Sequence, residues 1–131
     1  MKSGAISISI AILSSMMLAA LSFADGAGTS NKWRIELDGA AVKTGDMTFR
    51  LTPSQGDATD VTVSVKAGLA ENAVAKELRD ALSARLSPQR YTVEVDDGED
   101  VLIKKKEGQP DFAFELVESQ VGNVTIRIQS E

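Results

Sequence analysis

The arrangement of apolar residues constrains the fold of this chain more than any other feature of its sequence. In seven short segments apolar residues alternate with polar ones, whereas in one segment they recur at the spacing of an α-helix. Alternate side chains of a β-strand point to opposite faces, so the first pattern is typical of strands with one buried face. The chain is therefore predicted to be rich in strands and to contain one helix.

The predicted strands stand on both sides of the helix. They cover residues 33–37, 47–51, 61–65, 91–95, 101–103, 112–116 and 124–128. Asp97 and Gly98 separate two alternating segments, which favours a hairpin with a tight turn.

The segment 69–86 has apolar residues that share one face at 3.6 residues per turn. That face consists of Leu69, Ala70, Ala73, Val74, Leu78, Ala81, Leu82 and Leu86. Pro88 ends the helix because proline disfavours helical geometry in the preceding residue and has no backbone N–H to donate.

Strands clustered before and after one helix predict an α+β fold. We expect the helix, at about residues 69–86, to pack on a curved, mainly antiparallel sheet of about six to seven strands. One helix can cover only part of the apolar face of such a sheet. The rest must be covered by sheet curvature, by a second sheet layer or by another molecule.

The first 24 residues have the layout of a secretory signal peptide. Lys2 is their one charged residue, residues 5–23 are apolar or small, and Ser22-Phe23-Ala24 has small residues at both ends. We predict cleavage after Ala24. The alternative is an uncleaved membrane anchor, but the apolar run is near the lower limit for spanning a bilayer and is diluted by serine.

Three parts follow from this assignment: a cleaved signal peptide (1–24), a flexible leader (25–31) and a single α+β domain (32–131). Because cleavage removes only Lys2 among the charged residues, the net charge changes from -5 to -6. The protein is then expected to be exported to the periplasm or the extracellular space of a bacterium, with no stable membrane anchor after cleavage.

Composition excludes several classes of chemistry. The chain has 0 Cys and 0 His, which removes disulfides, thiol nucleophiles, thiolate metal sites and the commonest general base. Its negative charge argues against a nucleic-acid partner. Because the nucleophile-elbow, Walker and Rossmann motifs are also missing from the mature chain, we expect neither an enzyme nor a bound cofactor.

Four carboxylates gather at the predicted hairpin turn: Asp96, Asp97, Glu99 and Asp100. They are candidate calcium ligands, since calcium takes six to eight oxygen ligands. Their spacing is not that of an EF-hand, and neighbouring residues of a hairpin point to alternate faces. We therefore favour a solvated turn, with Asp and Gly chosen for positive backbone angles.

Two further features allow a structural and a functional interpretation. Lys104, Lys105 and Lys106 can contact an acidic partner or a lipid headgroup, but we favour a role in protecting an edge strand or its loop. Trp33 is the only tryptophan and can stack on a sugar or anchor an interface. Its register with Ile35 favours the core, and Tyr91 is expected to be half-buried.

The function that agrees best with these observations is that of an exported, non-catalytic interaction or structural module. It is expected to act through a sheet edge or an apolar face, on a protein partner or on a second copy of itself. The alternative is a small-ligand or calcium-binding protein, with a ligand between the helix and the curved sheet.

Overall fold

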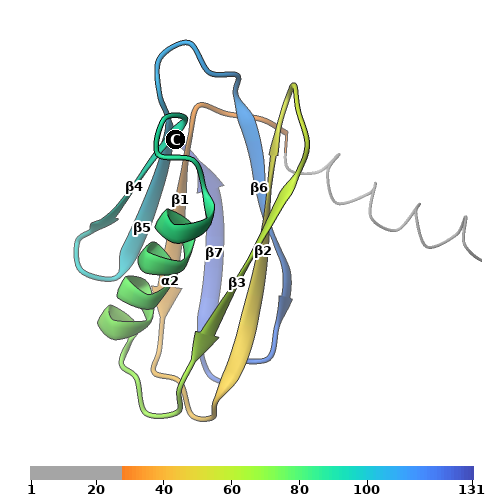
Figure 1. Ribbon diagram of the computed structural model, residues 1–131. Helices are drawn as coiled ribbons and strands as arrows, with labels where there is room; N and C mark the ends of the chain where they lie inside the picture. Colours follow the sequence, from red (N-terminus) through yellow and green to blue (C-terminus); the bar gives the residue numbers. More distant parts are fainter. Residues whose placement is uncertain (1–27) are drawn as a thin grey trace, which may run out of the picture.

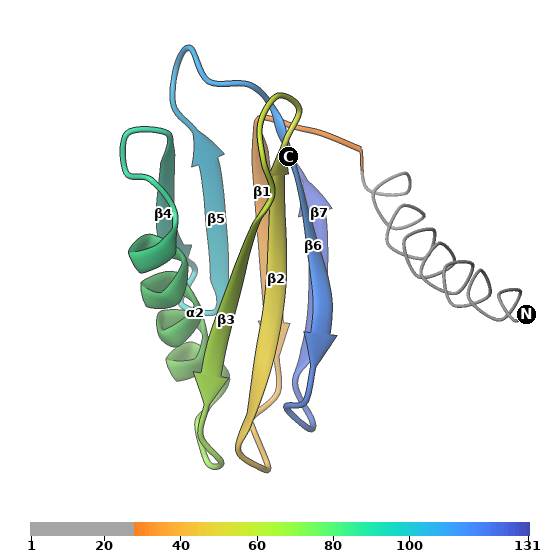
Figure 2. The ribbon, with the colours of Figure 1, turned by 45° about the vertical axis from the view of Figure 1, so that its right-hand side comes forward.

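The computed structural model describes residues 28–131, within which the chain forms seven strands and one helix (Figures 1 and 2). In chain order these are β1 (Lys32–Asp38), β2 (Gly45–Pro53), β3 (Thr59–Val65), α2 (Glu71–Arg85), β4 (Tyr91–Asp96), β5 (Asp100–Lys105), β6 (Phe112–Ser119) and β7 (Thr125–Ser130). The predicted signal peptide, residues 1–24, lies outside the described residues.

The strands form two antiparallel sheets that face each other. One has the order β4-β5-β1-β7 and the other the order β3-β2-β6. The predicted α+β fold, with one helix and about seven antiparallel strands, is confirmed. The single curved sheet that we expected is divided in two, so a second sheet layer covers much of the apolar surface that the helix cannot reach.

Helix α2 closes one side of this pair of sheets. It packs against β3, an edge strand of one sheet, and against β4, an edge strand of the other (Figure 1). Strands β6 and β7 are the edges on the opposite side, where no helix of residues 28–131 lies between the sheets (Figure 2). The two sides of the molecule are therefore closed differently.

The core lies between the sheets and beneath the helix. Phe49 of β2 and Phe114 of β6 stack in its centre with their ring centroids 5.5 Å apart. Its largest fully buried side chains are Phe49, Phe112, Phe114, Ile35, Leu37, Met47, Leu51, Leu78, Leu82, Ile103, Val61 and Val65. Their alternation along each strand is the period that the sequence shows.

The helix is shorter at each end than predicted. Ala70 and Leu86 flank it with extended backbone, and the N–H of Leu86 donates to the carbonyl of Leu82. Val74, Ala75, Leu78 and Leu82 are buried. Two residues of the predicted face differ: Ala73 is only half-buried, and Ala70 is exposed because it precedes the helix. Ala75 is buried instead, since the helix packs against strands of both sheets.

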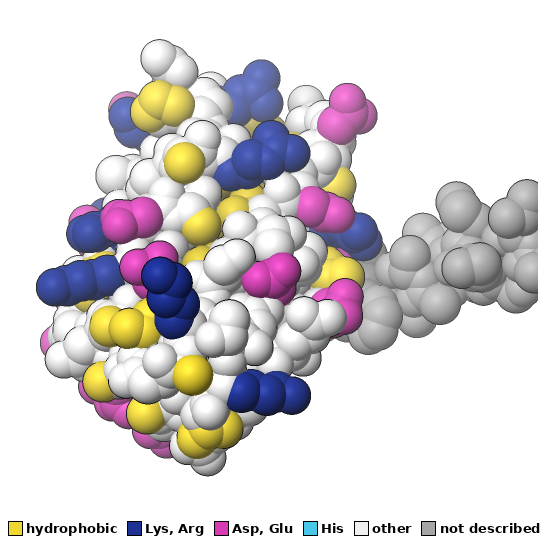
Figure 3. All heavy atoms as spheres, turned by 60° about the horizontal axis from the view of Figure 1, so that its bottom comes forward, with side chains coloured by type: hydrophobic (Ala, Val, Ile, Leu, Met, Phe, Trp, Pro, Cys, Tyr) yellow, Lys and Arg dark blue, Asp and Glu magenta, His cyan; other side chains and the backbone are white. Residues whose placement is uncertain are grey.

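The predicted hairpin joins β4 to β5. Asp97 and Gly98 both have positive φ angles, 55° and 79°, as the tight turn requires. Within the described part of the chain, no helix is both long and apolar enough to cross a membrane. The face seen from below the view of Figure 1 shows small, separate apolar patches among charged side chains (Figure 3).

Candidate functional site

Arg34 is the centre of a charged cluster on the outer face of the four-stranded sheet. It lies on β1, and its Nη1 donates to Asp100 at 2.7 Å and to Asp96 at 3.0 Å, while its Nε donates to Glu131 at 2.6 Å. Its side chain is 17% exposed and that of Asp100 is 12% exposed. One guanidinium on β1 therefore binds the carboxylates of Asp96 on β4, of Asp100 on β5 and of Glu131, the residue that follows β7.

The charges of this cluster stabilise one another. Hydrogen bonds from Arg34 hold the pKa of Glu131 below its usual value, and the pKa of Arg34 is raised, first by Glu131 and then by Asp100. Leu102, the β5 neighbour of Arg34, is 5% exposed although it lies on the outer face. The cluster therefore also covers an apolar side chain outside the main core.

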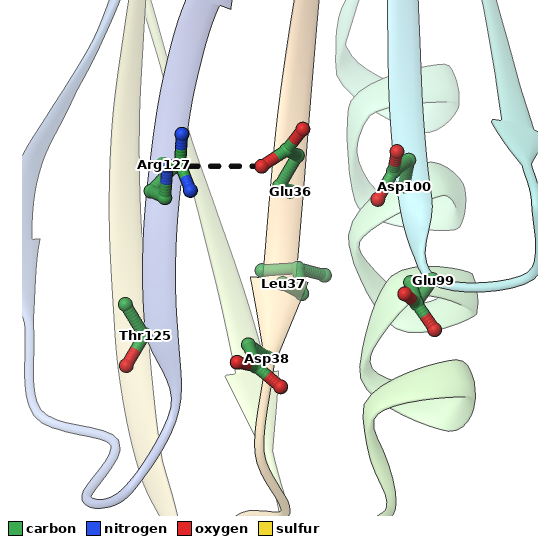
Figure 4. A pocket seen from close by; sticks show the side chains of 7 residues that line it. All are labelled: Glu36, Leu37, Asp38, Glu99, Asp100, Thr125 and Arg127. Atoms are coloured by element: carbon green, nitrogen blue, oxygen red, sulfur yellow. Dashed lines mark ion pairs between the residues drawn. The ribbon is translucent and has the colours of Figure 1, made fainter.

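Beside this cluster lies a hollow of about 300 Å³, which we call the acidic hollow (Figure 4). It is lined by Glu36, Leu37, Asp38, Glu99, Asp100, Thr125 and Arg127. The carboxylate of Glu36 and the guanidinium of Arg127 face each other at 3.7 Å (Figure 4). With one cation among four carboxylates, the acidic hollow is a negative surface on the outside of the sheet.

Glu99, which lines the acidic hollow, lies beside Glu71, and the two carboxyl groups shift each other's pKa. Glu71 accepts a hydrogen bond from the N–H of Gly39 at 3.0 Å, which is the main reason that its pKa is lowered. The pKa of Glu99 is raised, chiefly because its carboxyl lies within hydrogen-bonding reach of Glu71. Glu99 therefore takes up a proton before Glu71 does as the pH falls.

The four candidate calcium ligands are not gathered around one point. Asp96 and Asp100 both accept from Arg34, whereas Glu99 lies beside Glu71 and Asp97 is in the exposed turn. Across residues 28–131 no group of three or more acidic side chains has an arrangement that could hold a metal ion. The carboxylates are instead divided between an arginine and a second glutamate.

Both aromatic residues singled out in the sequence belong to the core. Trp33 is 4% exposed, and its Nε1 donates to the carbonyl of Phe112 at 2.7 Å. Tyr91 is more buried than expected, at 7% exposed, because its ring packs edge-on against that of Phe112, with the ring centroids 5.2 Å apart. Both rings are therefore held in the core rather than displayed on the surface.

The lysines 104–106 do not protect an edge strand. Lys104 and Lys105 belong to β5, which lies between β4 and β1, so that prediction is wrong for the strand itself. The pairing order of strands decides which one is an edge, and the linear sequence does not contain it. Lys105 does stabilise the loop that follows, through Nζ contacts to the Gln109 carbonyl at 2.7 Å and to Asp111 at 3.1 Å.

The other candidate surface is the side between the edge strands β6 and β7, which we call the β6–β7 opening. The N–H of Glu131 donates to the carbonyl of Lys32, so residues of β7 with odd numbers bond to β1. The backbone groups of Ile126, Ile128 and Ser130 therefore point away from the sheet. This row of N–H and C=O groups can pair with an additional strand.

Apolar side chains line the same opening. Leu116, Val124, Ile126 and Ile128 are only partly buried and pack on the rim of the core. A hollow of about 470 Å³ lies there, lined by Trp33, Phe114, Glu115, Leu116, Ile128, Gln129 and Ser130. Its bottom is core and its rim is the free edge of β7, so an added strand would bury apolar surface as well as form hydrogen bonds.

The other three edges carry features that hinder strand addition. Edge strands β3 and β4 have α2 packed against them. Strand β6 has a register shift opposite Thr48 and Phe49, and Ser30 exchanges two backbone hydrogen bonds with Phe112 at its start, both at 2.9 Å. Bulges and covering segments are common means of blocking an edge. The bonds of Ser30 also hold part of the predicted leader against the domain.

Comparison of the chain with protein-family models, with curated protein sequences and with solved structures found no match. The interpretation of these surfaces therefore depends on their geometry and chemistry. The acidic hollow was not indicated by the sequence, because Glu36 and Arg127 meet only through the pairing of β1 with β7. The alternation did indicate that Glu36 and Asp38 lie on the outer face.

Proposed function

We propose that this protein is an exported, non-catalytic interaction module, which binds by accepting a strand at the free edge of β7. The observation that supports this most directly is the unpaired backbone row of Ile126, Ile128 and Ser130 beside half-buried apolar side chains. Strand addition uses both, since backbone bonds supply affinity and alternate side chains supply specificity.

The charged outer face supplies a second condition for binding. An incoming strand on β7 would lie next to Arg127, whose side chain is 70% exposed, and close to the acidic hollow. Its outward side chains would therefore meet charged groups, while its inward side chains would meet Leu116 and Ile128. A strand that alternates apolar and polar residues fits both faces.

The test compares proline substitutions at two edges. Ile128→Pro removes an N–H that points away from the sheet, so the ladder between β1 and β7 is kept. Val93→Pro on β4 is the matched control. The N–H of Lys106 donates to the carbonyl of Arg90, so the even-numbered residues of β4 form the backbone hydrogen bonds to β5. The N–H of Val93 therefore points away from the sheet, as that of Ile128 does. Val93 is also a half-buried β-branched residue.

C-terminally tagged wild type and both variants would be crosslinked and captured from the cell envelope and from the medium, then analysed by mass spectrometry. We expect a partner, or a self-crosslink, with wild type and Val93→Pro that is lost with Ile128→Pro. The same spectra give the mature N-terminus and so test export and cleavage after Ala24. A processed, partnerless monomer would instead favour a small ligand in the β6–β7 opening.

A further inference from the structure

The free edge of β7 is complementary to the same edge of a second copy of the chain. We infer that the strand accepted at the β6–β7 opening is β7 of a second copy of this chain, paired antiparallel about a twofold axis at Ile128. This inference rests on the proposed function and names the partner in it. It follows from the register, from the side chains on each face and from the charge of the edge.

The register follows from which backbone groups are free. With the axis at Ile128, Ile128 faces Ile128 of the other copy and Ile126 faces Ser130, so all three outward-pointing residues obtain bonding partners. An axis at Ile126 would place Ser130 opposite Gly122, next to Asn123, whose φ of 69° is incompatible with a strand. The axis at Ile128 is therefore the one that uses the full length of the strand.

The inward side chains complement each other in this register. Ile128 and Ile126 are partly exposed at the rim of the opening. Pairing of two copies places the two Ile128 side chains side by side and extends the apolar rim of one copy over the hollow of the other. The dimer thus buries apolar side chains of the β6–β7 opening that are partly exposed in a single copy. It also joins the four-stranded sheets of the two copies into one continuous sheet.

The outward side chains also agree with this register. Arg127 lies opposite Gln129 of the other copy and is diagonal to both its Glu131 and its Arg127, so one diagonal contact is attractive and the other is between like charges. An axis at Arg127 would instead set two arginines against each other, which is unfavourable. Residues 125–131 contain one basic and one acidic side chain, whereas the outer face of β4 carries two acidic ones, Glu94, which is exposed, and Asp96, which is paired with Arg34. Self-pairing is therefore less opposed by charge at β7 than at β4.

The absence of cysteine from the chain allows a direct test of the register. The side chains of residues 127 and 129 both face outward. In the inferred dimer, residue 127 of one copy lies directly opposite residue 129 of the other as a non-hydrogen-bonded pair, and the Cα separation of about 4.5 Å suits a disulfide between Arg127→Cys and Gln129→Cys. We expect a disulfide-linked dimer when the two variants are mixed and oxidised, and little from either variant alone. Thr62→Cys on the outer face of the other sheet is the control for random collision.

Sedimentation of the mature protein over a concentration series tests the dimer itself. We expect wild type and Val93→Pro to associate and Ile128→Pro to remain monomeric. A wild type that is monomeric at every concentration, or crosslinking of Arg127→Cys with itself, would overturn the inference. If wild type is monomeric but Ile128→Pro still loses an envelope partner, strand addition stands with a different occupant. If Ile128→Pro changes neither measurement, the proposed function fails as well.

Discussion

Replacing Arg34 tests the role assigned to the charged cluster on the outer face. Arg34→Met keeps the apolar stem over Leu102 but removes three hydrogen bonds of 2.6–3.0 Å to carboxylates. Asp100, with a side chain only 12% exposed, then loses its cationic partner. Loss of one member of a fully buried pair costs 3–5 kcal/mol, and partial exposure reduces this. We expect the free energy of unfolding to fall by about 2–4 kcal/mol.

The matched control lies on the central strand of the other sheet. Arg50→Met breaks the pair with Asp60, but there the side chains are 31% and 47% exposed, so the expected loss is less than about 1 kcal/mol. Urea unfolding, followed by Trp33 fluorescence and by circular dichroism, gives both values from the shift in midpoint at constant slope. Adding Asp100→Asn to Arg34→Met should restore part of the stability. Equal losses for the two arginine variants would refute the argument from burial.

Four further outcomes are expected. Leu82→Asp should abolish the cooperative thermal transition, because it places an unpaired charge on the fully buried helix face; a normal melt would show that this face is assigned wrongly. Gly45→Ala should lower the free energy of unfolding by about 1–3 kcal/mol, since a Cβ there would lie 2.6 Å from the carbonyl oxygen of Gln120; an unchanged free energy of unfolding would contradict this close approach. Hydrogen bonds from arginine lower the pKa of Asp60 and of Glu131 on folding. The two ionised carboxylates therefore stabilise the fold above about pH 4–5, and this stabilisation is lost as the pH falls through their lowered pKa values. A pH series of unfolding midpoints measures the loss. Millimolar calcium should leave the melting temperature unchanged, and a rise would indicate a cation site.

The period of the apolar residues determined most of the secondary structure. Period two placed Ile35, Phe49 and Val63 inside and their neighbours outside, and it did so because a strand offers only two faces. The change of period located the helix, and Asp97-Gly98 located a hairpin because few residues accept positive φ angles. These signals are local, so the linear sequence contains them in full.

Only the tertiary structure decided which strands pair and which strands are edges. The same alternation is compatible with one curved sheet or with two, because period two specifies a face and not a neighbour. The position of β5 inside its sheet, the meeting of Arg34 with Asp100, and the free backbone row of β7 all depend on contacts between residues far apart in the chain. Hydrogen-bonding capacity is nearly the same in every strand, and the packing of side chains between the two sheets determines where it remains unused.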